Sequence, residues 1–227
     1  MNSFHASKTA ETSKDGLLKF IELSETLAQM AKSEDIELVP FESRELNKFR
    51  ALPEVVQSGV TQILSEYVSI LESIKAQGQN LSYNLNSVWA AFGRYGMRPN
   101  FGLLQLLHPE DIIEIYNLDG IQVFRSFHFF RLCSYTIEDL LCSTWHDLFH
   151  RESGPDTAYF EYFGRLISGK IRDTEKMAVD AHLVRETSSP KRLVGIVEPR
   201  YVAPLFDNTK RVNGFVHIFN ASPISNA

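Results

Sequence analysis

The hydrophobic period of the chain changes near residue 111, and this change constrains the fold more than any other feature of the sequence. Before it, apolar residues recur every three or four positions, which is the spacing of one face of a helix. After it, apolar and polar residues alternate, as in strands that bury one face. The two halves predict an α+β protein in which an all-α N-terminal region precedes a sheet.

The N-terminal region is expected to be helical over residues 16–98. Residues 1–15 are rich in Ser, Thr and Lys, and this composition predicts a disordered tail. The helix with the clearest pattern should begin at Pro53, where a missing amide hydrogen is harmless, and end by Gly78. Residues 99–110 are interpreted as a linker to the second half.

A 3.5-residue repeat along the helix from Pro53 predicts a packing seam. The seam consists of Val56, Val60, Ile63, Tyr67, Ile70 and Ile74. A sustained period of 3.5 keeps one apolar face against a partner helix, so we expect the seam to be the coiled-coil interface of a homodimer. The alternative is that the partner helix lies within the same chain.

The second half is predicted to contain several strands, with one longer helix among them in the sequence. Asp119-Gly120 is a tight hairpin signal between two short strands. A helix is predicted over residues 157–168, and alternating runs predict strands over residues 177–183, 193–202 and 212–218. These elements predict a single antiparallel sheet with helices on one face.

Four segments of this half resemble motifs of the PAS domain family. Their sequences are DGIQVFRSFHFFRLCSY at 119–135, YTIEDLL at 135–141, TWHDLFHRE at 144–152 and NGFVHIFN at 213–220. They occur in the order in which the family has them. The resemblance covers residues 111–221 and implies a PAS-like antiparallel five-stranded sheet with short helices on one face, followed by a tail over residues 222–227.

The resemblance also implies where a site would lie. PAS domains use the concave face of the sheet and the short helices to enclose a small molecule, or fill that space with side chains. The candidate pocket residues are Phe124, Phe129, Tyr135, Trp145, Phe149, His182 and His217. Their aromatic crowding is compatible with a filled core and with a small apolar pocket, and we favour the filled core. Trp145 is expected to be anchored against the sheet.

Bound cofactors are disfavoured. The resemblance places Trp145 where flavin photosensors of the family carry a cysteine, and the helix over residues 157–168 has no histidine to ligate heme iron. We therefore expect no cofactor. Heme, flavin or a metabolite in the pocket remains the alternative.

Composition and motifs exclude several other functions. The net charge of −5 argues against a nucleic-acid partner. No long apolar run and no apolar N-terminal segment occur, so we expect no membrane association and a cytoplasmic location. Cys133 and Cys142 lack metal-ligand spacing and are expected to be buried thiols. The motifs of common hydrolases and nucleotide-binding enzymes are missing, which predicts no enzymatic activity.

The sequence thus leads to one hypothesis and one alternative. The hypothesis is a non-enzymatic PAS-type sensory and protein-interaction module that dimerises through its N-terminal helices. It would relay a signal to a protein partner or to an output domain outside this chain. The alternative is a small-molecule receptor that uses the PAS pocket.

Overall fold

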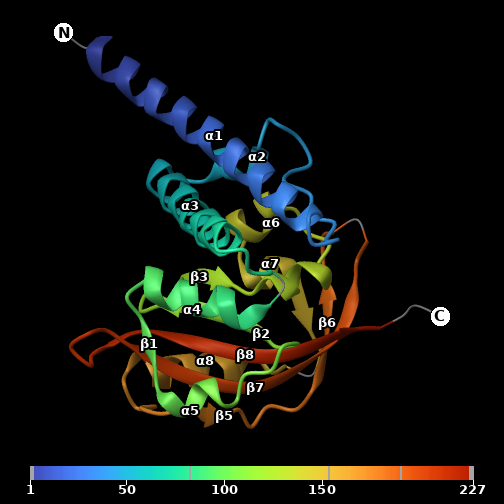
Figure 1. Cartoon of the computed structure of the whole chain (residues 1–227). Helices are drawn as coiled ribbons and strands as arrows, with labels where there is room; N and C mark the ends of the chain where they lie inside the picture. The colour runs from blue at the N-terminus through green and yellow to red at the C-terminus, as the bar shows by residue number, and fades with distance from the viewer. Residues whose placement is uncertain (1–2, 82, 153, 190, 225–227) are drawn as a thin grey trace.

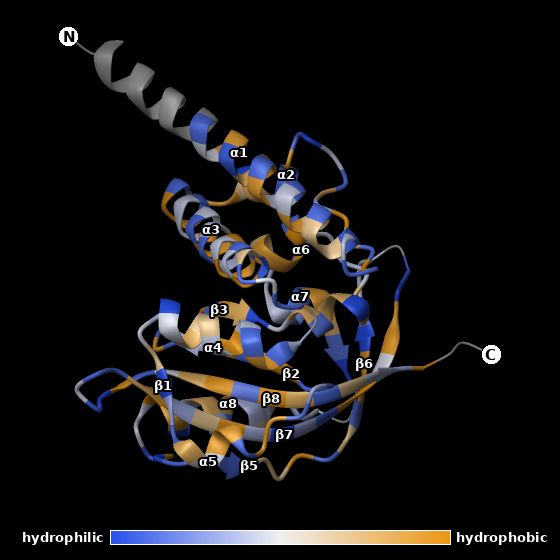
Figure 2. Cartoon of the chain, in the orientation of Figure 1, coloured by the Kyte–Doolittle hydropathy of each residue, from blue (hydrophilic) through white to orange (hydrophobic). Residues whose placement is uncertain are grey.

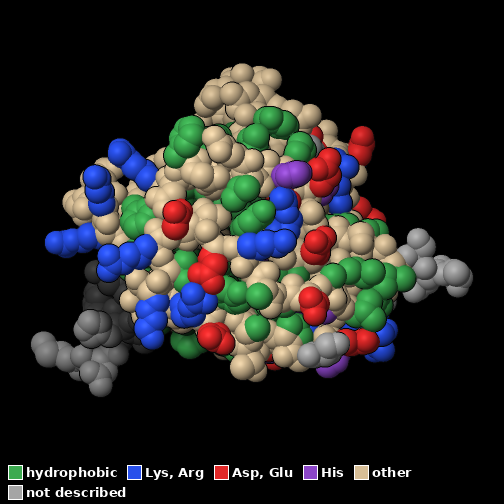
Figure 3. All heavy atoms as spheres, turned by 90° about the horizontal axis from the view of Figure 1, so that it is seen from below, with side chains coloured by type: hydrophobic (Ala, Val, Ile, Leu, Met, Phe, Trp, Pro, Cys, Tyr) green, Lys and Arg blue, Asp and Glu red, His purple; other side chains and the backbone are tan. Residues whose placement is uncertain are grey.

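The computed structural model describes residues 3–81, 83–152, 154–189 and 191–224, with side chains from residue 15 onward. It is an α+β structure in which N-terminal helices are followed by a curled antiparallel sheet, as the change of hydrophobic period predicts (Figure 1). On the face seen from below, hydrophobic side chains are interspersed with acidic and basic ones (Figure 3).

The N-terminal region consists mainly of α1 (Ser3–Lys32), α2 (Asn47–Ala51), α3 (Glu54–Ala76) and α4 (Asn84–Arg94). The expected tail over residues 1–15 differs from the structure, in which α1 already begins at Ser3. No Gly or Pro interrupts residues 3–14, so the backbone continues the helix once the packed turns after residue 16 have formed it. Helix α3 begins directly after Pro53 and ends before Gly78, which adopts a positive φ of 70°.

The expected linker over residues 99–110 is held to the sheet. Strand β1 (Arg98–Pro99) pairs with β7 (Val194–Phe206), and α5 (Phe101–Leu104) follows it. Asn84 of α4 also donates hydrogen bonds to the carbonyl groups of Pro109 and Asp111. The N-terminal helices are therefore fastened to the sheet at both ends of this segment.

The sheet has six strands in the order β3-β2-β8-β7-β6-β4, with β1 and β5 (Glu175–Lys176) pairing with β7 beside this path. The remaining strands are β2 (Ile112–Asn117), β3 (Gln122–Arg125), β4 (Phe149–Arg151), β6 (His182–Glu186) and β8 (Val212–Pro223). The sequence predicts five strands because β4 is short and lies within a helical motif, yet its backbone pairs with β6. The run over 177–183 is only partly a strand, since Met177 and Val179 pack into a small hydrophobic cluster instead.

Short helices follow β3: η1 (Phe127–Arg131), α6 (Ile137–Cys142) and α7 (Trp145–Leu148). The longer helix α8 (Asp156–Ile167) comes next, close to the predicted range of 157–168, and packs on β7 and β8. Hydrophobic stretches are evident along β8 and α6 (Figure 2).

Both faces of the sheet are buried at β2 and at the middle of β8, which corrects the expectation of helices on one face. Side chains of β2 and β8 that point away from α8, such as Ile113 and Val216, are fully buried. They share a hydrophobic core with Val88, Ala91 and Phe92 of α4. The N-terminal helices therefore supply a second layer that the second half of the sequence does not encode.

Candidate functional site

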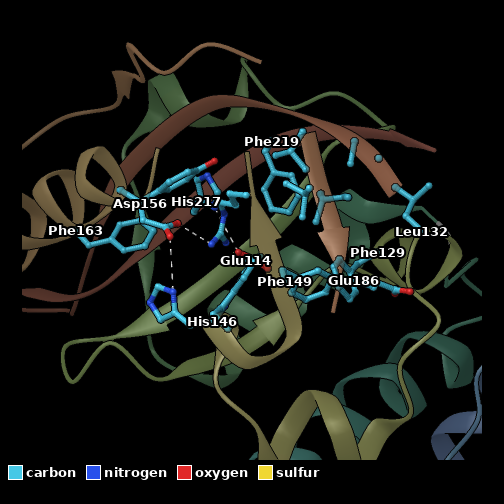
Figure 4. A pocket seen from close by; sticks show the side chains of 18 of the residues that line it. Glu114, Phe129, Leu132, His146, Phe149, Asp156, Phe163, Glu186, His217 and Phe219 are labelled. Atoms are coloured by element: carbon cyan, nitrogen blue, oxygen red, sulfur yellow. Dashed lines mark hydrogen bonds and ion pairs between the residues drawn. The ribbon is translucent and has the colours of Figure 1, made fainter. Parts of the chain in front are cut away.

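The concave face of the sheet encloses a cavity of about 330 Å³. Strands β2, β6, β7 and β8 form one wall, while η1, α7, β4 and α8 contribute side chains to the others (Figure 4). A third of the lining residues are aromatic. The aromatic side chains are Tyr116, Phe129, Trp145, Phe149, Tyr159, Phe160, Phe163, Phe215 and Phe219. The space is therefore hollow, and the expectation that side chains fill it is wrong for this structure.

A row of three polar side chains crosses the sheet at this cavity. Glu114 of β2 lies opposite Arg125 of β3 and opposite His217 of β8 in the strand register. Neighbouring residues at one register position point to the same side of a sheet, so the three side chains meet on the concave face. Tyr116, two residues beyond Glu114, points the same way.

Glu114 is fully buried and is held by three donors. Its carboxylate accepts from Arg125 Nε at 3.1 Å and from the Tyr116 hydroxyl at 2.8 Å, and His217 Nδ1 lies 3.4 Å away. Burial by itself raises the pKa of this carboxyl. The positive charge of Arg125, with the hydrogen bonds from His217 and Tyr116, outweighs burial and lowers the pKa to about 2. Glu114 is thus an ionised group inside the protein.

The His217 ring lines the cavity and is 4% exposed. It stacks on Phe219 with ring centres 4.9 Å apart, and it meets the ring of Tyr159 edge-on at 5.4 Å. Its Nδ1 faces Glu114, whereas its buried Nε2 has no hydrogen-bond partner among the described residues. An unpaired nitrogen of this kind costs free energy unless something in the cavity binds it.

Two guanidinium groups approach Trp145. Arg125 lies 5.6 Å and Arg151 4.6 Å from the centre of the indole ring. Arg151 also bonds to Asp156 of α8 at 2.9 Å, and His146 Nδ1 lies 3.8 Å from the same carboxylate. Each arginine at the cavity therefore already faces a carboxylate. Trp145 packs against the core as expected, but it is only half-buried because one side borders the cavity.

Glu186 is a third carboxylate at the cavity, and its role there is structural. It accepts hydrogen bonds from the amide and hydroxyl groups of Ser134, the hydroxyl of Ser189 and the amide of Leu193. These four bonds fasten the turn before α6 to the end of β6. The carboxylate is therefore occupied by protein donors.

The structure brings four of the seven predicted pocket residues to the cavity: Phe129, Trp145, Phe149 and His217. Phe124 instead packs against Tyr67 of α3, with ring centres 5.3 Å apart. The Tyr135 hydroxyl donates to the carbonyl of Leu148. His182 lies behind Tyr159, and burial lowers its pKa.

Sequence reasoning missed Glu114, Arg151, Tyr159 and Phe163. A signal existed for three of these positions. Glu114 is a single acid within the apolar run of β2, where an unpaired charge would be costly. Tyr159 and Phe163 are four residues apart on α8 and so share one face of that helix.

The seam residues of α3 face the chain's own core for the most part. Val60, Tyr67, Ile70 and Ile74 are buried, Ile63 is half-buried, and Val56 is 41% exposed. The Tyr67 hydroxyl donates to the carbonyl of Arg125 at 2.7 Å. Because α1 and α4 pack against this helix, the intramolecular alternative describes the four buried positions. Of the six seam residues, only Val56 at the start of α3 is exposed.

Among the described side chains, no group of three or more His, Cys, Asp or Glu residues could hold a metal ion. Cys133 is buried and Cys142 half-buried, and burial raises the pKa of each thiol to about 12. No helix in the described part of the chain is long and apolar enough to cross a membrane.

Comparison with known proteins found no family model and no curated protein that matches this chain.

Proposed function

We propose that this chain is a non-enzymatic PAS-type sensory module that binds a small molecule in the cavity and relays its presence through the N-terminal helices. We expect it to act in the cytoplasm. The order of elements supports the PAS assignment: two strands, short helices, one longer helix and three strands follow each other and curl around a hollow, with the short strands β4 and β5 before and after the longer helix. This is the arrangement that the sequence resemblance implies.

The open cavity carries the proposal. Its volume of about 330 Å³ lies at the lower end of the range for small-molecule sites, roughly 300–1,000 Å³. One water occupies about 30 Å³, so the space equals about eleven waters and suits a compound of roughly that many non-hydrogen atoms. Heme and flavin nucleotides are several times larger than such a compound. The cavity therefore favours a small metabolite over the larger cofactors.

A contact path supports the relay to the helices. Arg125 bonds to Glu114 at the cavity through its side chain, and its carbonyl accepts the Tyr67 hydroxyl of α3. In η1, Phe129 lines the cavity. The neighbouring Phe130 packs edge-on against the Tyr67 ring, with ring centres 6.3 Å apart. A ligand that shifts η1 would therefore shift the packing of α3.

A second path runs through α6. The Glu138 carboxylate accepts the backbone amides of Lys48 and Phe49, at 2.8 and 3.1 Å, and Lys48 forms an ion pair with Asp139. The amides of Ile137 and Glu138 also donate to carbonyl groups of the segment between α1 and α2. These bonds tie α6, which lies between η1 and α7 in the chain, to the region that we propose to be the output.

The proposed output is a change in association with a second copy or a protein partner. Val55 and Val56 at the start of α3 are 79% and 41% exposed. They lie at the end of the seam that the described side chains leave exposed. We propose that a second copy of the chain, forming a homodimer, or a signalling partner binds there.

The test uses two adjacent residues of β7 that point to opposite faces. Val197 lines the cavity, whereas Ile196 is 42% exposed and lies outside it. Val197→Phe should fill part of the cavity, and Ile196→Phe adds similar bulk elsewhere. Indole, with about nine non-hydrogen atoms, should bind the wild type with a dissociation constant on the order of 0.1–1 mM.

Titration calorimetry and amide NMR shifts would follow this binding. We expect the wild type and Ile196→Phe to bind indole, Val197→Phe to bind at least tenfold more weakly, and the Tyr67 amide to shift with occupancy. If indole does not bind the wild type, or binds all three proteins equally, the cavity is not a receptor site. If indole binds without any shift in α3, the proposed relay is wrong.

A further inference from the structure

We infer that the cavity selects a neutral, flat aromatic compound whose N–H or O–H group donates a hydrogen bond to Nε2 of His217. This inference rests on the proposed receptor function and names the chemistry of its ligand. It follows from three observations: the tautomer of His217, the charge balance of the cavity and the nature of its walls.

The hydrogen-bond network assigns the tautomer. A carboxylate only accepts hydrogen bonds, so the ring nitrogen that faces ionised Glu114 must carry the proton. That nitrogen is Nδ1, at 3.4 Å from Glu114 Oε2. In the neutral imidazole the other nitrogen, Nε2, is then an acceptor. The inference takes the ring in this neutral form, in which the charge of Arg125 alone balances that of Glu114 and the buried cluster has no net charge.

The acceptor is unused in the described part of the chain. Nε2 of His217 has no protein partner there and almost no accessible surface, so a ligand reaches it once the ring turns toward the cavity. A buried unpaired acceptor is unfavourable, and a ligand that brings a donor removes this penalty. A ligand that offers only acceptors, or no polar atom, leaves the penalty in place. The cavity therefore discriminates by hydrogen-bond donation.

The charges around the cavity disfavour an ionic ligand. Arg125 pairs with Glu114, and Arg151 pairs with Asp156. Glu186 already accepts four hydrogen bonds from the protein. A charged ligand would lose its hydration in the cavity, where the groups of opposite charge are already paired within the protein. This cost favours a neutral compound.

The walls of the cavity favour a flat, conjugated ligand. Phe129 of η1, Phe149 of β4 and Phe219 of β8 present aromatic surface to the cavity (Figure 4). Phe215 of β8 also lines it. Offset-stacked and edge-to-face contacts with such rings are more favourable for an aromatic ligand than for an aliphatic one. Together with the volume, these walls describe one or two fused rings that carry a donor group.

Two probes of nearly the same shape test the inference. Indole carries an N–H group, and 1-benzothiophene replaces that group by sulfur. In the wild type, indole should bind roughly tenfold or more tightly than 1-benzothiophene, because only indole pairs with Nε2. In His217→Phe this preference should fall below about threefold.

His182→Phe is the matched control, because it makes the same substitution on β6 at a ring outside the cavity lining. Its preference for indole should equal that of the wild type. Equal binding of both probes to the wild type overturns the inference while the receptor function stands, as does a preference that survives in His217→Phe. If neither probe binds the wild type, both proposals fail together. Should His217→Phe fail to fold, the wild-type comparison alone decides the need for a donor.

Discussion

Replacing Arg125 by methionine tests how the ionised Glu114 is tolerated inside the protein. The two side chains are 10% and 0% exposed, and their N–O distance is 3.1 Å. With an effective dielectric constant of about 20, two unit charges at this distance attract by roughly 5 kcal/mol. Removing one partner of a buried pair costs about 3–5 kcal/mol, since the other charge remains desolvated. We expect Arg125→Met to lose this much stability at pH 7.

The pH dependence of the stability lost in Arg125→Met identifies the cause of that loss. In the wild type the pKa of Glu114 is lowered from 4.5 to about 2. Its contribution to stability is therefore present above pH 4.5 and is lost as the pH falls toward 2. In Arg125→Met, burial raises this pKa without opposition from the guanidinium. The folded mutant then takes up a proton that the wild type does not, so the stability gap should shrink as the pH falls from 7 to about 4.

Urea unfolding at pH 7 and pH 4 measures both effects. Arg125→Met with Glu114→Gln should recover part of the loss, because no uncompensated charge remains. Arg165→Met is the matched control: its ion pair with Glu175 is more than one-third exposed on the arginine side, and its loss should stay below about 1 kcal/mol. A loss below 1 kcal/mol for Arg125→Met, or an equal loss at both pH values, would refute the reasoning.

Three further outcomes are expected. Tyr67→Phe removes a buried hydrogen bond to the carbonyl of Arg125 and should cost roughly 1–3 kcal/mol in urea unfolding; an unchanged midpoint would contradict the contact. The Cys133 thiol, with its pKa raised to about 12, should react with a thiol reagent at pH 8 only after unfolding, and rapid labelling of the native protein would argue against its burial. The double substitution Val55→Glu with Val56→Glu should dissociate the proposed homodimer and so halve the molecular mass measured by light scattering. A monomeric wild type would contradict the proposed homodimer.

Local patterns in the sequence determined the elements themselves. Pro53 and Gly78 set the ends of α3, because a missing amide hydrogen suits a helix start and a positive φ suits the turn after its end. Asp119-Gly120 closes the hairpin between β2 and β3, with Gly120 at a φ of 74°. Each of these features depends on a few neighbouring residues, so each can be read along the chain.

Only the tertiary structure decided what the elements face. The seam of α3 has the period of a coiled coil, but a period does not specify whether the partner helix belongs to the same chain. Likewise, alternation shows which residues of a strand share a face, but not which residue lies opposite on the next strand. Glu114 meets Arg125 across 11 residues of sequence and His217 across 103. That register, and the hollow left beside it, arise from the packing of the whole chain.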